Sequence, residues 1–150
     1  MKIAIGCDHA GFALKETVLH VLNECKHTVI DCGTCSCERV DFADFAFKAA
    51  QKVATKQADK AILICGSGVG MCIAANKVKG IRASVCHDAY SAHQAVEHDD
   101  LNVLCLGARI IGPALAEDLV KQFLSATFKT GTRHEERLQK IIAFENAHFK

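Results

Sequence analysis

The stretch around Cys65 has the residue types and spacing best suited to chemistry in this sequence. Four apolar residues at 61–64 precede the cysteine, and a helix-like pattern resumes after the glycines that follow it. The stretch consists, in order, of Cys65, Gly66, Ser67, Gly68, Val69 and Gly70. This order predicts a buried strand, a tight turn and a helix N-terminus, whose backbone N–H groups can hold an anion. A thiol at that position is favoured as thiolate.

Familiar phosphate and nucleotide motifs do not fit this glycine turn. No Gly-Lys-Ser/Thr follows at the spacing of a Walker loop, and the third glycine falls one residue too early for the dinucleotide fingerprint. A phosphatase-type arginine is also missing, because the residue six positions after the cysteine is Met71. The turn could also serve only to connect a strand to a helix, and this alternative stays open.

Asp8 and His9 form a second polar group, directly after the first predicted strand. At the end of a strand they could contact a polar ligand. Equally, Asp8 could cap the following helix while His9 lies in solvent.

Two further groups lie later in the chain. Arg133 and Arg137 are one turn apart at the start of the last predicted helix, where cations oppose the helix dipole, so a bound anion would explain them. A surface salt-bridge cluster with neighbouring glutamates is the alternative. His98 ends another predicted helix beside Asp99 and Asp100, a setting that favours a protonated imidazole, although it could be an ordinary surface histidine.

Cys32, Cys35 and Cys37 could indicate redox chemistry or zinc binding. A redox Cys-x-x-Cys pair normally opens a helix, however, and these cysteines lie in a loop-like Gly/Thr/Ser stretch. Zinc would need a second ligand pair, for which His27 is the one near candidate. We therefore expect incidental cysteines here.

The elements that must position these groups alternate along the chain. Apolar runs predict strands at 2–5, 28–31, 61–65, 81–86 and 102–106. Helices are predicted from about 12 to 25, 42 to 53, 69 to 78, 88 to 98 and 113 to 124, and a last one is capped by Thr132 with Glu135. Such alternation predicts an α/β, doubly wound, Rossmann-like three-layer αβα domain. We expect a five-stranded parallel sheet, an extra C-terminal helix that packs on a partner subunit, and one domain over residues 1–150.

Composition limits the class of protein. The chain has 18 Lys and Arg against 17 Asp and Glu, which argues against a nucleic-acid binder held by bulk charge. No apolar run approaches the ~20 residues that span a bilayer, so we expect no membrane association. Nine cysteines, an odd number, occur without a secretory signal, which favours reduced thiols in the cytoplasm.

Taken together, these motifs resemble the ribose-5-phosphate isomerase B family, which also includes galactose- and allose-6-phosphate isomerases. The resemblance covers nearly the whole chain. It runs through residues 6–11, 40–44, 65–70, 74–77, 80–83, 98–104, 107–109 and 133–137. It implies an aldose–ketose isomerase of the non-oxidative pentose phosphate pathway, with no metal or organic cofactor. The implied assembly is a homodimer or dimer of dimers whose active sites are shared between subunits.

By matching positions, the resemblance also implies residue roles. Cys65 would be the base that moves a proton between C2 and C1 of the open-chain sugar, Ser67 would assist proton transfer among the sugar oxygens, and His98 would open the furanose ring. The N–H groups from Gly66 to Gly70 would hold the enediolate, and Asp8 would contact the ring oxygen or hydroxyls. The phosphate end would be formed by His9, Arg109, Arg133, His134 and Arg137.

Two departures from the family pattern affect substrate contacts. Asp99 stands where the family usually has an asparagine that contacts sugar oxygens, and an ionised carboxylate cannot donate a hydrogen bond. Phe42 and Ala43 stand where Tyr and Pro are common, so a phenol hydroxyl is lost. Ribose 5-phosphate is the expected substrate, and a six-carbon aldose 6-phosphate of allose or galactose type is the alternative. Outside enzymes, a thiol-redox or metal-binding protein using the three loop cysteines remains possible, as, with less support, does a nucleotide-binding regulatory domain.

Overall fold

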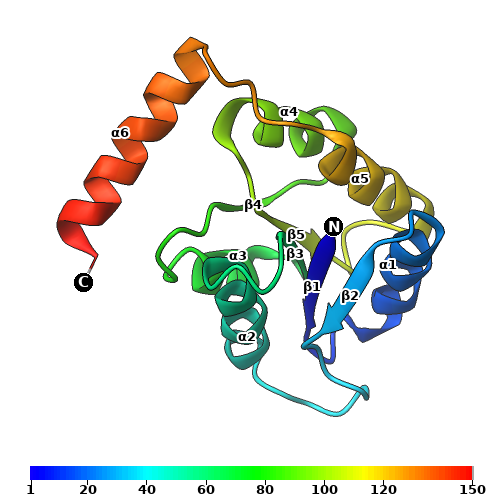
Figure 1. Cartoon of the computed structure of the whole chain (residues 1–150). Helices are drawn as coiled ribbons and strands as arrows, with labels where there is room; N and C mark the ends of the chain where they lie inside the picture. The colour runs from blue at the N-terminus through cyan, green and yellow to red at the C-terminus, as the bar shows by residue number, and fades with distance from the viewer. Residues whose placement is uncertain (150) are drawn as a thin grey trace.

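The computed structural model describes residues 1–149 as an α/β fold with parallel strands (Figure 1). The strands are β1 (Lys2–Cys7), β2 (Thr28–Asp31), β3 (Lys60–Cys65), β4 (Ala83–Val85) and β5 (Val103–Gly107). The helices are α1 (Phe12–Glu24), α2 (Phe42–Ala54), α3 (Val69–Ala75), α4 (Ala89–Asp99), α5 (Pro113–Ser125) and α6 (Arg133–His148). The predicted alternation of strands and helices and the three-layer fold are confirmed.

The five strands form one parallel sheet in the order β2-β1-β3-β5-β4. Helices α1, α4 and α5 cover one face, and α2 and α3 cover the other (Figure 1). Parallel strands all end at the same edge of the sheet, so residues that follow them gather there. Each helix runs back and therefore ends near the opposite edge.

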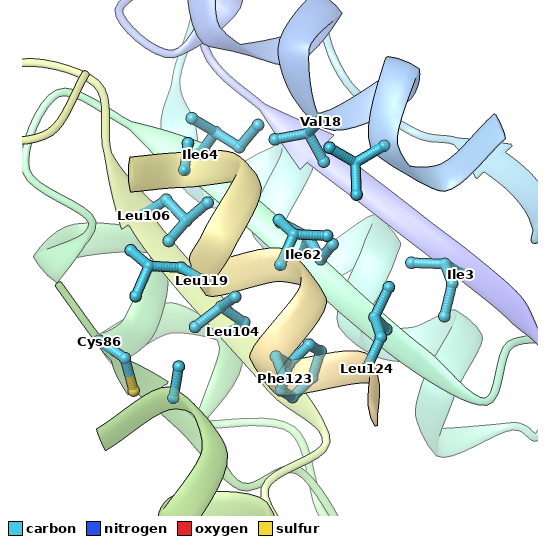
Figure 2. Packing of buried hydrophobic residues seen from close by; sticks show 14 of the residues in the cluster. Ile3, Val18, Ile62, Ile64, Cys86, Leu104, Leu106, Leu119, Phe123 and Leu124 are labelled. Atoms are coloured by element: carbon cyan, nitrogen blue, oxygen red, sulfur yellow. The ribbon is translucent and has the colours of Figure 1, made fainter. Parts of the chain in front are cut away.

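The core consists of two apolar layers, one on each face of the sheet. Because side chains alternate along a strand, Ile62 and Ile64 of β3 face α1 and α5, while Leu63 and Cys65 face α2 and α3. Figure 2 shows the first layer, in which Phe123 of α5 lies among fully buried strand residues. Full burial of each large apolar side chain contributes about 1.5–3 kcal/mol, which makes the sheet a rigid support for the residues at its edges.

Helix starts follow the predicted signals. Asp41 accepts a hydrogen bond from the Ala43 N–H at 3.0 Å, and Thr132 accepts one from the His134 N–H at 3.2 Å. Glu135 reaches back as a capping box requires, although its carboxylate accepts from the Gly131 N–H and not from that of Thr132.

Two predicted elements are shorter in the structure. Helix α3 ends at Ala75, where 78 was predicted, and β4 begins at Ala83, where 81 was predicted. The Asn76 amide donates to the Ala83 carbonyl oxygen at 2.9 Å and accepts from the Ala83 N–H at 2.9 Å. Asn76, the C-cap of α3, thus joins the end of that helix to the first residue of β4, whose strand partner is Val103.

Helix α6 is largely detached from the rest of the fold (Figure 1). Leu138 is its one buried residue in the part of the chain that the structure describes. Near its ends, Lys129 forms an ion pair with Glu97 at 2.8 Å and the Gly80 N–H donates to Glu145 at 2.9 Å. Across residues 1–149, no helix is both long and apolar enough to span a bilayer.

Candidate active site

The glycine turn lies where predicted, between β3 and α3, with Cys65 as the last residue of the strand. The Cys65 side chain is buried, and its Sγ accepts a hydrogen bond from the Gly68 N–H at 3.1 Å. Gly68 has a φ of 82°, a left-handed conformation that other residues adopt only with strain. Gly70 lies under the Phe42 ring, where a Cβ would come within 2.9 Å of it. The turn therefore needs glycine at these positions.

The sequence predicted that the backbone N–H groups of the turn are free to hold an anion. In the structure, two of them are already bonded within the turn. The Gly68 N–H donates to the Cys65 sulfur, and the Val69 N–H donates to Ser67 Oγ at 3.3 Å. The bond from the Gly68 N–H fixes the position of the Cys65 sulfur within the turn. Ser67 is exposed, and its hydroxyl is held over the start of α3.

Asp8 and His9 lie against this turn, because the Asp8 N–H donates to the carbonyl oxygen of Ile64 at 3.2 Å. Asp8 is buried, and its Oδ1 accepts from the N–H groups of Ala10 and Gly11 at 3.0 and 2.9 Å. The capping alternative is wrong, because α1 begins at Phe12 with Gly11 as its N-cap and no side-chain cap, and Oδ1 instead closes the turn before the helix. Oδ2 is the oxygen that could meet a ligand. His9 Nδ1 accepts from the Val40 N–H at 3.3 Å, which leaves Nε2 as the ring nitrogen to donate.

Arg109 follows β5 and lies beside the same turn. Its backbone N–H donates to the Gly66 carbonyl oxygen at 3.0 Å. Its side chain covers Gly66, where a Cβ would come within 3.4 Å of the arginine Cδ. One exposed guanidinium is therefore placed next to the cysteine and its glycines.

A second group forms where α4 ends and α6 begins. The rings of His98 and His134 stack with centroids 3.8 Å apart and an interplanar angle of 14°. Arg133 and Arg137 lie in the first two turns of α6, and both are exposed. The salt-bridge alternative is not supported, because no ion pair found in residues 1–149 includes either arginine.

The surroundings of His98 differ from those that the sequence predicted. The carboxylate of Asp100 forms an ion pair with Arg82 at 2.6 Å. His98 Nδ1 instead pairs with the side-chain amide of Gln94, one turn earlier in α4. Gln94 was not among the residues predicted from the sequence, although its i, i+4 spacing from the histidine could have revealed it.

The surroundings of His134 disfavour its protonated form. Desolvation and the charges of His98, Arg137, Lys129 and Arg133 lower its pKa below the ordinary histidine value. Its Nδ1 is buried without a hydrogen-bond partner among residues 1–149. A bound anion would offset the surrounding positive charge.

The two groups lie at opposite edges of the sheet. Cys65 pairs with Gly107 at the carboxyl edge, whereas the Ala61 N–H donates to the carbonyl oxygen of Asn102 at the amino edge. His98 precedes Asn102 by four residues and therefore belongs to the amino edge. Four residues of strand separate the edges by ~13 Å. One chain thus does not bring Cys65 and His98 to the same substrate.

The three loop cysteines lie outside both groups. Cys32 is half-buried, and burial raises the pKa of its thiol, whereas Cys35 and Cys37 are exposed. Their loop is held by Lys15, which pairs with Asp31 at 2.6 Å and donates to the Thr34 carbonyl oxygen at 3.0 Å. Residues 1–149 contain no group of three or more His, Cys, Asp or Glu side chains placed to hold a metal ion. The described residues therefore form no metal site around these cysteines, and the redox alternative stays open.

The two departures from the family pattern, Phe42 and Asp99, lie at different edges of the sheet. Phe42 is next to Gly70 at the carboxyl edge, so a phenol at this position would extend toward the glycine turn. Asp99 is exposed at the end of α4, next to His98.

Comparisons with known proteins point to one family of sugar-phosphate isomerases. A family model described as Ribose/Galactose Isomerase matches residues 3–141. Ribose-5-phosphate isomerase B of Escherichia coli is 48% identical over 144 residues, covering 96% of each chain. A ribose-5-phosphate isomerase B structure from Clostridium thermocellum has a TM-score of 0.95 and 46% identity, covering 99% of each chain. The Mycoplasma genitalium isomerase B structure with bound ribulose-5-phosphate has a TM-score of 0.90 and 41% identity, covering 97% of this chain and 96% of that one.

Proposed function

Because this chain belongs to the ribose/galactose isomerase family, we propose that it interconverts D-ribose 5-phosphate and D-ribulose 5-phosphate. The observation that carries the proposal is Cys65 at the end of β3, with its sulfur hydrogen-bonded to Gly68 inside the glycine turn. Proton abstraction beside a carbonyl needs a base of matched pKa and donors near the developing oxyanion. Here a cysteine thiol and backbone N–H donors lie within six residues.

In the proposed reaction, the Cys65 thiolate removes the proton from C2 of the open-chain aldose and returns it to C1. The intermediate is an enediolate, whose oxygens the remaining N–H groups of the turn would hold. The Ser67 hydroxyl, exposed beside that position, would move the proton between the two oxygens. Asp8 would accept hydrogen bonds from sugar hydroxyls through Oδ2.

Residues from two copies of the chain would carry out ring opening and phosphate binding. His98 would protonate the furanose ring oxygen, and Arg133, His134 and Arg137 would hold the phosphate together with His9 and Arg109 of the other copy. Asp99, adjacent to His98, would contact sugar oxygens only as an acceptor. The ~13 Å between the sheet edges supports a complete site built from Cys65 of one subunit and His98 of another.

Exposed apolar side chains support the same assembly. Val69 and Ile73 of α3 are 51% and 59% exposed, and Ile141 and Phe144 of α6 are 54% and 64% exposed. Such residues commonly mark a protein interface. Since the α3 residues lie beside the glycine turn, a homodimer or dimer of dimers would cover them with the α6 end of the partner. The single domain over residues 1–150 and a cytoplasmic location, suggested by nine unpaired cysteines, stay predictions.

The test is a coupled assay on ribose 5-phosphate, allose 6-phosphate and galactose 6-phosphate, with added EDTA as a check for metal dependence. We expect ribose 5-phosphate to give the highest kcat/KM and EDTA to have no effect. A higher kcat/KM for allose 6-phosphate or galactose 6-phosphate would favour the alternative function, isomerisation of a six-carbon aldose 6-phosphate. No turnover of any of the three would refute the proposed function.

A further inference from the structure

We propose that Arg39 is an additional phosphate-binding residue, supplied by the same chain as Cys65, in the cavity between the β1–α1 turn and the start of α2. This inference rests on the proposed function, because it deepens the account of the same site. The cavity has a volume of about 420 Å³ and is lined by Asp8, His9, Arg39, Val40, Asp41 and Phe42. None of the sequence motifs had assigned a role to Arg39.

The cavity adjoins the reacting end of the site. The Phe42 ring that lines it also covers Gly70 of the glycine turn. On the other side, the Asp8 turn contacts β3 so closely that a Cβ on Gly11 would lie 3.0 Å from the Cys65 backbone nitrogen. A ligand in this cavity would therefore lie next to the cysteine turn.

The backbone around Arg39 is fixed on both sides. The following residue, Val40, donates its N–H to His9, and Asp41 caps helix α2. Five residues upstream, the Thr34 N–H donates to the Cys7 carbonyl oxygen at 3.0 Å. The Thr34 carbonyl oxygen accepts a hydrogen bond from Lys15 Nζ. The exposed arginine side chain is thus presented from a held segment.

The lining holds two carboxylates and one guanidinium, so an anion is favoured only beside Arg39. Among the lining side chains, Arg39 is the one permanently charged cation, and its fork of N–H groups suits phosphate oxygens. Asp8 and Asp41 each commit an oxygen to backbone N–H groups. No ion pair recorded within residues 1–149 engages the Arg39 guanidinium. Together with His9 Nε2, it forms a pair of donors facing one space.

The experiment compares Arg39→Gln and Arg39→Lys with Lys48→Gln, which removes an exposed cation from the same helix region outside the cavity. Measured quantities are KM and kcat for ribose 5-phosphate and the inhibition constant of inorganic phosphate. Loss of one charge-assisted hydrogen bond at an exposed site predicts that Arg39→Gln raises KM and the phosphate inhibition constant together by about tenfold. We expect kcat to change less than about twofold, because phosphate binding is common to ground and transition states.

Arg39→Lys should recover part of the loss, and Lys48→Gln should match the wild type. An unchanged phosphate inhibition constant in Arg39→Gln would overturn the inference, as would a fall in kcat alone. If the wild type does not turn over ribose 5-phosphate, the proposed function fails. Arg39 is then tested by the rise in melting temperature that inorganic phosphate produces. A smaller rise in Arg39→Gln than in Lys48→Gln supports phosphate binding, and equal rises refute it.

Discussion

Mixing two inactive variants should restore activity if the site is shared between subunits. Cys65→Ala removes the base at the carboxyl edge, and His98→Asn removes the ring-opening acid at the amino edge. The edges are ~13 Å apart, whereas proton transfer requires contact at about 3 Å, so one chain cannot use both residues on one sugar. In a mixed dimer, one site keeps both residues and the other loses both.

The size of the recovery follows from symmetry. Random pairing of equal amounts makes about half of the dimers mixed, each with one intact site of two, which predicts about 25% of wild-type activity. The assay is turnover of ribose 5-phosphate after the variants are mixed, unfolded and refolded together, with the refolded wild type as the reference. Mixing Cys65→Ala with the double variant Cys65→Ala/His98→Asn is the control, since neither chain supplies the thiol. Activity no greater than the sum of the two separate variants, with mixed dimers shown to be present, would refute a shared site.

Three further predictions concern single residues. Cys65→Ala should lower kcat by about 10²–10⁴ while circular dichroism and melting temperature stay near those of the wild type; a smaller loss would mean that another group is the base. Among the thiols outside the active site, we expect iodoacetamide to label Cys72 first at pH 7, as judged by peptide mass spectrometry. The reason is that hydrogen bonds, above all the one with Cys105, lower the pKa of Cys72 to about 7. Faster labelling of Cys25, Cys35 or Cys37, which are exposed, would contradict this. Because desolvation and neighbouring cations lower the pKa of His134, the unfolded chain binds more protons there, and stability should fall as pH drops below about 6.5. In His134→Asn the melting temperature should depend less on pH in that window, and an unchanged dependence would exclude this histidine as the cause.

Much of the fold could be predicted from local patterns. Apolar runs of strand length alternate with helical periodicity, and Asp41, Pro113 and Thr132 mark helix starts, so the layers followed directly. Element ends were less predictable. The Asn76 amide follows the end of α3 and bonds to Ala83, the first residue of β4, and nothing in the local sequence indicates that contact between residues seven apart.

The sequence by itself determined which residues are candidates for the site. Cys65, its glycines and the arginine pair of α6 occur in short motifs, so their chemistry can be recognised locally. Tertiary structure alone decided how these candidates are divided. The direction of the strands puts Cys65, Asp8 and Arg109 at one edge, and the return of α4 puts His98 at the other. It also assigned the Gly68 N–H to the sulfur of the cysteine. Both outcomes depend on where the backbone turns in space, since neighbours in the site are distant along the chain.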